Sequence, residues 1–212
     1  MPQKVCSYIA AMLPFMLCML LPLVLFRCFR SKRLKRRGLL TTIYHETGWV
    51  LFAVFLAGLA SQTVIPKEWF GHPAAAAADG TRLINWMPFR VIGETWHAFF
   101  LKDNISPFVI NFLGNIVMFM PIGFFPPLLW SGMGFRRTLL IGFFSSLFIE
   151  ICQFPQPRVS DIDDLWLNTL GTAAGFCMFM LVKRLTPKFI GKCRVRKKDE
   201  PARNTPPPDI VN

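Results

Sequence analysis

Long apolar stretches dominate the chain and are separated by short clusters of cations, prolines or glycines. Five of them are about long enough to cross a bilayer as a helix, which takes roughly 20 residues. They cover roughly residues 5–26, 39–60, 107–130, 138–154 and 161–185. The pattern predicts an all-α, polytopic membrane protein built as a bundle of about five transmembrane helices.

The connection between the second and third stretches, residues 61–106, has two different parts. Its first part holds five consecutive alanines, residues 74–78, between a proline and Asp79-Gly80, which is typical of a linker. Its second part, residues 85–100, is rich in aromatic side chains, and Ile92, Trp96 and Phe99 have helical spacing. This spacing predicts an amphipathic helix that lies in the outer membrane interface.

The overall composition agrees with a membrane protein. Of the 212 residues, 53% are hydrophobic and 17% are charged, and the mean hydropathy is +0.41. Soluble domains carry roughly 25% charged residues. The net charge of +12 comes from cations that flank the apolar stretches, as expected where charge sets membrane topology. No basic patch of a soluble fold is indicated, so nucleic acid is not an expected partner.

Clusters of cations follow the first and the last apolar stretch. Seven Lys and Arg residues lie between residues 27 and 37, and eight lie between residues 183 and 198. Because such clusters stay in the cytoplasm, we expect the N-terminus outside and the C-terminus inside. The first stretch has no small-residue cleavage site, which predicts a retained anchor and not a cleaved signal.

Composition divides the chain into three parts. Residues 1–38 are expected to form a transmembrane anchor and a basic cytoplasmic loop, residues 39–186 a transmembrane domain, and residues 187–212 a basic, proline-rich cytoplasmic tail. The last dozen residues are expected to be disordered. Six cysteines lie singly along the chain, which indicates neither a disulfide framework nor a metal site.

Polar residues gather at the predicted outer ends of three apolar stretches. Ionisable and amide groups are costly in lipid, so they normally face a bundle interior or a water-filled pocket. We therefore expect one shared, outward-facing polar pocket that binds a ligand. Its candidate residues are Asn111, Asn115, Glu150, Gln153, Arg158, Asp161, Asp164 and Asn168.

One face of the last stretch carries polar residues followed by glycines. A helix turns about 100° per residue, which places five residues within an arc of about 80°: Asp161, Asp164, Asn168, Gly171 and Gly175. Asp163 points away from this arc and is expected to be solvated. The fourth stretch has a similar stripe, formed by Gly142, Ser146, Glu150 and Gln153.

Small residues on these faces predict close helix packing. Gly171 and Gly175 form a GxxxG pattern, and Gly114 lies on the third stretch. Small residues let helices approach closely in lipid. A purely structural interpretation stays open, because aspartates stabilise helix starts and asparagines link helices in lipid. Arg158 would then only pair with a carboxylate.

Tyr44, His45 and Glu46 interrupt the second stretch near its inner end. Two interpretations remain open for them. They reach a partner helix or the membrane interface, or they form a second functional site.

The motifs resemble those of the VanZ-like family, over about residues 39–186. The first motif runs from Asn111 to Asn115 and continues with Phe119, Pro121 and Gly123. The second consists of Glu150, Gln153, Arg158, Asp161, Asp163, Asp164, Asn168, Gly171 and Gly175. Asn85, Pro88 and Phe89 resemble a shorter motif before them. His45-Glu46, the alanine tract and the tail depart from the family pattern.

The resemblance implies a bacterial cytoplasmic-membrane protein and low-level resistance to lipoglycopeptides such as teicoplanin. It does not supply a reaction. A lipid-linked cell-wall precursor, or a lipoglycopeptide with an acyl tail, suits a pocket at the membrane interface. In this interpretation Arg158 contacts a phosphate or carboxylate, for which its guanidinium is well shaped. The bilayer is the other expected partner, and no cofactor or metal is expected.

Two other classes of function remain open. An intramembrane enzyme would use Glu150 as acid or base, with Asp161 and Asp164 holding Mg²⁺ beside a substrate phosphate. The chain has no GxSxG or HExxH motif to support this. A transporter or flippase is the other class, but no inverted repeat is visible.

Overall fold

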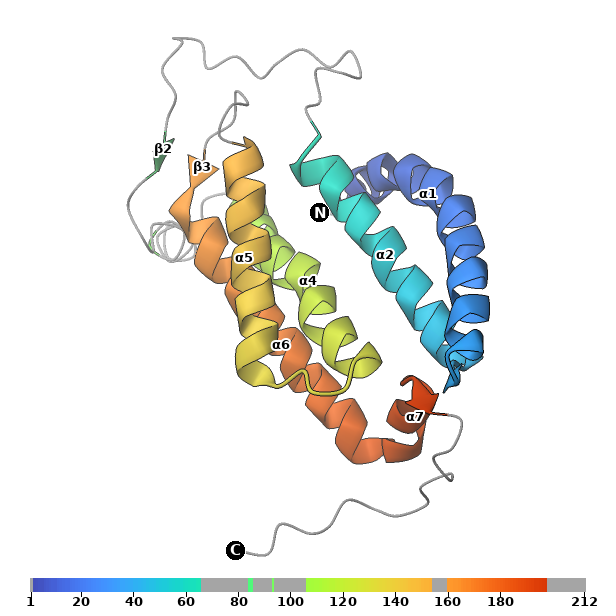
Figure 1. The fold of residues 1–212 in the computed structure, drawn as a ribbon. Helices are drawn as coiled ribbons and strands as arrows, with labels where there is room; N and C mark the ends of the chain where they lie inside the picture. The colour runs from blue at the N-terminus through green and yellow to red at the C-terminus, as the bar shows by residue number, and fades with distance from the viewer. Residues whose placement is uncertain (1, 66–83, 86–92, 94–105, 154–159, 198–212) are drawn as a thin grey trace, which may run out of the picture.

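The protein is a bundle of long helices (Figure 1). The computed structural model describes residues 2–65, 84–85, 93, 106–153 and 160–197. The long helices are α1 (Pro2–Arg36), α2 (Ile43–Thr63), α4 (Ser106–Leu129), α5 (Phe135–Gln153) and α6 (Ile162–Leu185). A short helix, α7 (Pro187–Lys192), follows α6. The predicted all-α membrane bundle is confirmed.

Four helical segments are long and apolar enough to cross a membrane. They are Ala10–Arg36, Ile43–Thr63, Phe112–Leu129 and Asp163–Leu185. Helix α5, at the predicted fourth span, is not among them, because it carries Arg136, Arg137 and Glu150. Its 19 residues extend over about 28 Å, close to the roughly 30 Å of a hydrocarbon core. The crossing of α5 therefore stays a prediction.

Two pairs of very short strands lie at opposite ends of the bundle. β1 (Leu39–Leu40) pairs antiparallel with β4 (Arg196–Lys197), and β2 (Ile84–Asn85) pairs parallel with β3 (Ser160–Asp161). We name the two ends after the elements found there, the β2–β3 end and the α7 end (Figure 1). The loop between α4 and α5 lies at the α7 end.

Helix α1 extends ten residues beyond the predicted end of the first span. It continues through the cationic segment that was expected to be a loop and ends at Arg36. Lys and Arg are good helix formers, and cations in a last turn interact favourably with the helix dipole. Gly38 then adopts a left-handed conformation, with a φ of 72°, and stops the helix.

Helix α2 starts later than predicted, at Ile43 and not at Leu39. Thr42 is its N-cap, and the Thr42 side chain accepts a hydrogen bond from the backbone N–H of His45. This bond satisfies one of the free amides at the helix start. The two leucines before it are then available for strand β1.

Helices α4 and α6 approach each other backbone to backbone. A Cβ atom added to Gly171 or Gly175 would overlap the backbone of Ile116 or Met120 on α4. Gly123 of α4 touches the backbone of Thr172 in the same way. Gly114 has open space around it, so the structure gives no support for the packing role predicted there.

The apolar core lies where α2, α4 and α5 meet. Its buried residues are Phe52, Leu59, Phe119, Ile122, Leu129 and Ile149. A second cluster joins α4 and α6 to α7 and contains Leu128, Phe179, Ile190 and Cys193. The two clusters hold the C-terminal half of α4 against neighbouring helices.

The α7 end is held by polar contacts to the start of α2. His45 is buried and donates from Nδ1 to the carbonyl oxygen of Cys193, at 2.8 Å. Thr42 donates its hydroxyl proton to the carbonyl of Lys192. Arg27 of α1 forms an ion pair with Glu46, with 2.7 Å between Nε and Oε2. His45 and Glu46 therefore reach partner elements, the first of the two interpretations left open.

Candidate functional site

Six of the eight candidate residues sit on α4, α5 and α6, toward the β2–β3 end, and Asp161 lies in β3 (Figure 1). Packing of α4 against α6, and of α5 against α6, brings the three helices together there. The polar ends of the stripes predicted on α5 and α6 thus share one end of the bundle.

The first contact links α4 to α6. Asn115 donates from Nδ2 to a carboxylate oxygen of Asp164, and both side chains are half-buried. Asp164 is therefore held in place by a neighbouring helix.

The second contact links α6 to α5. Asn168, 6% exposed, donates from Nδ2 to the Ser146 hydroxyl at 2.9 Å. The Asn168 Oδ1 atom is buried and has no hydrogen-bond partner among the described residues. Buried polar atoms are nearly always paired with protein or water. An unpaired amide oxygen at this position is consistent with a bound water or ligand group.

Farther from the β2–β3 end than Asn168, the same faces of α5 and α6 continue with small residues. Thr172 is fully buried, donates to the Asn168 carbonyl at 3.0 Å, and lies against Gly142 of α5. Sequence reasoning did not single out Thr172. The sequence feature that could have identified Thr172 is its position one turn after Asn168, on the face of Gly171 and Gly175.

The third contact links α5 to α2. Gln153 is buried and donates from Nε2 to the carbonyl oxygen of Thr63, at 3.0 Å. Glu150, one turn earlier on α5, is half-buried and has an interaction partner in the structure. No sequence signal identified Thr63, because it contributes only its backbone oxygen to this bond.

Asp163 corrects one expectation from the helical angles. It was expected to be solvated but is fully buried, and it accepts a hydrogen bond from the Trp166 indole at 2.8 Å. The helix begins at Ile162, so Asp163 lies in its first turn, where a carboxylate is favoured. Trp166, three residues later, is close enough to cover it.

The β2–β3 pairing places Asn85 beside the start of α6. Asn85 and Asp161 are direct partners in the strand register. This contact joins the short motif around Asn85 to the second motif. The side chains of Asn111 and Asp161, all of Arg158, and most of the predicted interfacial segment 85–100 lie outside the described residues.

Charge is distributed unevenly between the two ends. Two half-buried carboxylates, Glu150 and Asp164, lie at the β2–β3 end. Apart from Lys4, the lysines and arginines of the described residues lie on the segments that run toward the α7 end. Within the described parts of the chain, no three His, Cys, Asp or Glu side chains are grouped to hold a metal ion.

The comparison with protein families identifies this arrangement. The model of the VanZ/LLP1 family matches residues 52–183. The chain belongs to the VanZ/LLP1 family. The matched region runs from the middle of α2 to near the end of α6, and it contains the polar contacts described at the β2–β3 end. It lies inside the predicted extent of 39–186. No curated protein and no solved structure matches the chain.

Proposed function

We propose that this VanZ/LLP1 protein binds an envelope ligand at the outer leaflet and gives low-level, teicoplanin-type resistance. The ligand class is a lipid-linked cell-wall precursor or a lipoglycopeptide. The proposal concerns a binding or envelope-modifying protein, with no reaction assigned. It takes Asn111, Asn115, Glu150, Gln153, Arg158, Asp161, Asp164 and Asn168 as the ligand-binding set.

One observation carries the proposal. Three helices bring Asn115, Asp164, Asn168 and Ser146 together at one end of a membrane bundle, and the buried Asn168 Oδ1 atom has no hydrogen-bond partner in the part of the chain that the structure describes. Intramembrane polar groups are costly, so a cluster with an unused acceptor points to a ligand. The proximity of Asn85 to Asp161 supports a site that extends into the outer connection.

The roles follow from the chemistry of the side chains. Arg158 contacts a phosphate or carboxylate of the ligand, because its planar guanidinium can donate two parallel hydrogen bonds. Glu150 and Asp164 hold cationic groups or orient Arg158. Asn115 fixes the Asp164 carboxylate through their hydrogen bond.

The orientation is part of the proposal. The cations near the α7 end favour a cytoplasmic location for that end, which puts the polar cluster outside. In the same scheme, residues 1–38 contain the anchor and a cytoplasmic basic segment, and residues 187–212 are a cytoplasmic tail. The N-terminus is outside and the C-terminus inside.

A structural role is the second candidate, and the hydrogen bonds favour it. Asn115, Gln153 and Asn168 each link two helices. Polar links of this kind stabilise helix association in lipid by about 0.6 kcal/mol on average. In this case the cluster would hold the bundle together and bind nothing.

Expression in a teicoplanin-susceptible bacterium tests the proposal. The readouts are growth inhibition by teicoplanin, inhibition by a glycopeptide without an acyl chain, and the composition of lipid-linked wall precursors. Asp164→Asn and Glu150→Gln should abolish the resistance at unchanged membrane abundance. Asp79→Asn is the matched control, since it removes a carboxylate from the alanine-rich linker.

Arg158 separates ligand recognition from simple ion pairing. Arg158→Lys keeps the charge but loses the planar fork, so it should behave like Arg158→Ala. Near-normal resistance per folded molecule in Arg158→Lys would contradict the recognition role. If all the variants lose abundance in proportion to resistance, the structural role explains the cluster.

A further inference from the structure

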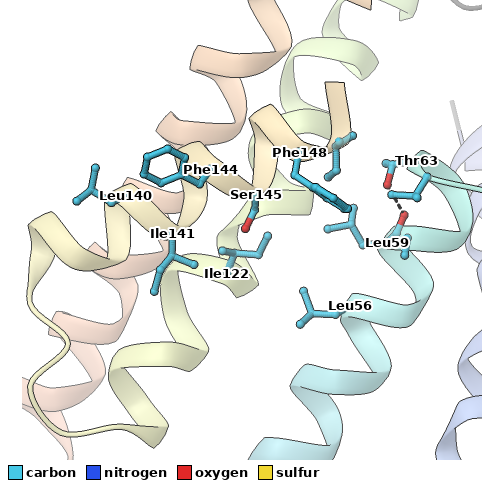
Figure 2. Close-up of a pocket in the computed structure, with 12 residues that line it drawn as sticks. Leu56, Leu59, Thr63, Ile122, Leu140, Ile141, Phe144, Ser145 and Phe148 are labelled. Carbon is cyan, nitrogen blue, oxygen red and sulfur yellow. Dashed lines mark hydrogen bonds between the residues drawn. The ribbon is translucent and has the colours of Figure 1, made fainter. Parts of the chain in front are cut away.

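An apolar groove lies between α2 and α5, next to the polar cluster (Figure 2). Its volume is about 530 Å³, within the range of small-molecule pockets, roughly 300–1,000 Å³. The buried side chain of Ile122 from α4 forms the floor. Phe144 and Phe148 of α5, about 60% exposed, stand on one side, and Leu56 of α2 stands on the other.

The groove offers few polar partners to a ligand. All lining side chains are apolar except those of Thr63 and Ser145. The Thr63 hydroxyl already donates to the Leu59 carbonyl at 2.8 Å, as Figure 2 shows. A cavity with so few polar partners does not hold ordered water. Its occupant must therefore be hydrocarbon.

The groove also has the length of a lipid chain within one leaflet. Helices α2 and α4 contain candidate membrane spans, so the groove lies within the hydrocarbon region and its exposed rim faces lipid. The lining residues on α5, from Leu140 to Ile149, extend over about 14 Å. This is about half of a 30 Å hydrocarbon core, the thickness of one leaflet.

The groove ends at the polar cluster. Thr63 lines it, and the carbonyl of Thr63 accepts the hydrogen bond from Gln153. Ile149, also in the lining, precedes Glu150 in the chain. A chain in the groove would therefore have its polar end at the level of Glu150 and Gln153, and its tail toward the membrane centre.

We infer that the groove between α2 and α5 holds one hydrocarbon chain of the envelope ligand, which enters sideways from the membrane. The inference rests on the proposed function for the identity of the ligand. It adds the place where the tail of that ligand binds: the head is held by the polar residues of α4, α5 and α6, and the chain is held by the groove.

Photochemical labelling of the full chain tests the inference. The protein is reconstituted in vesicles of equal parts phosphatidylcholine and phosphatidylglycerol, with a trace of phosphatidylglycerol that carries a diazirine in one acyl chain. Detergent extraction removes bulk lipid before irradiation. Adducts should then concentrate several-fold on residues 56–64 and 140–149, compared with exposed α1 positions such as Leu17 and Leu21. Adducts that follow exposure alone would overturn the inference.

Filling the groove provides the matched variants. Ser145→Phe adds a ring from α5, and Ala60→Leu adds bulk from the facing wall on α2. Each should lower the groove adducts several-fold, whereas Val117→Phe, on an exposed face of α4, should leave them unchanged. If Ser145→Phe fails to fold, the smaller change at Ala60 decides. Unchanged labelling in a folded filling variant contradicts the inference.

Resistance measured on the same variants separates the two proposals. In one outcome, the groove is labelled as expected but Asp164→Asn leaves resistance unaffected. This outcome supports the groove and contradicts the proposed function. In the opposite outcome, Asp164→Asn loses resistance. Ser145→Phe and Ala60→Leu lose their groove adducts but keep full resistance. That pattern keeps the proposed function and overturns the assignment of the groove to its ligand.

Discussion

Neighbouring aspartates at the start of α6 have different surroundings. Asp163 is fully buried and bound to the indole of Trp166, whereas Asp164 is half-buried and bound to Asn115 of another helix. The first bond is local to α6, and the second crosses to α4. We expect Asp163 to contribute to stability and Asp164 to ligand binding.

Substitution of the two aspartates tests this division. Asp163→Ala removes the acceptor of the hydrogen bond from the half-buried Trp166 indole, a loss of about 1 kcal/mol. It should lower the thermal stability of the purified protein and its membrane abundance, with normal resistance per folded molecule. Asp164→Asn should show the reverse, and equal effects of both changes would contradict the division.

Glycines on α4 and α6 determine how closely these helices pack. Gly→Ala in an open helix position is stabilising by up to about 1 kcal/mol, because alanine restricts the unfolded chain. At Gly175 that gain is outweighed, since the added Cβ overlaps the backbone of Met120. Overpacking typically costs about 1–3 kcal/mol, and backbone contacts cannot relax by a rotamer change.

We therefore expect Gly175→Ala to lower the melting temperature in detergent, by several degrees for about 2 kcal/mol. Gly114→Ala is the matched control, because no atom lies within 4 Å of its added Cβ. It should be neutral or stabilising. A loss of stability at Gly114 equal to that at Gly175 would mean that packing against α4 is not the cause.

The sequence predicted the helices better than their ends. Apolar length identifies a helix in lipid, so all five long helices appear near their expected positions. The ends depend on local chemistry that apolar length does not report, such as the Thr42 cap and the left-handed Gly38. Asp163 was misjudged because a helical angle does not reveal that Trp166 covers it.

Contacts far apart in the sequence were the least predictable. Arg27 was counted with the basic loop, yet it is 4% exposed, pairs with Glu46 and lies 4.7 Å from the Trp49 ring centre. Gln153 was predicted as a ligand residue, but its partner on α2 was not. Such pairs depend on which helices pack against each other. The spacing of residues along a single sequence does not show this.

At the scale of elements, α7 joins the C-terminal part to the start of α2. Cys193, just after α7, is buried, and burial raises the pKa of its thiol while nearby Arg194 lowers it to a smaller extent. A raised pKa means that the folded state favours the protonated thiol. The protonated Cys193 thiol therefore contributes to the stability of the folded state below the ordinary thiol pKa, about 8.5. This contribution is lost as pH rises through the raised pKa.

Opening the α7 contact should therefore expose Cys193 and lower its pKa. In a background where the other five cysteines are serine, alkylation of Cys193 should be slow and should still be rising above pH 8.5. His45→Ala removes a hydrogen bond to Cys193, worth about 1 kcal/mol. It should speed alkylation several-fold and shift the profile to lower pH. Unchanged profiles would show that α7 stays docked without His45.

At the scale of the whole molecule, the two ends of the bundle differ in the chemistry of their side chains. The α7 end combines the cationic ends of α1 and α6 with the exposed side chains of Ile43, Tyr44 and Phe189. The β2–β3 end combines half-buried acids and amides. A bilayer with anionic lipids in its inner leaflet favours the cationic end inside. Every functional proposal above requires the opposite end to face outward.

Cysteine labelling in intact cells tests that orientation. In a cysteine-free background, a cysteine replacing Gln156, between α5 and α6, should react with a membrane-impermeant maleimide. A cysteine replacing the exposed Ser131, between α4 and α5, should react only after permeabilisation. The two positions flank α5, so the pair also tests whether this helix crosses the membrane. Labelling of both in intact cells would mean that α5 does not cross. The reversed pattern would place the polar cluster in the cytoplasm, where a lipoglycopeptide outside the cell could not reach it.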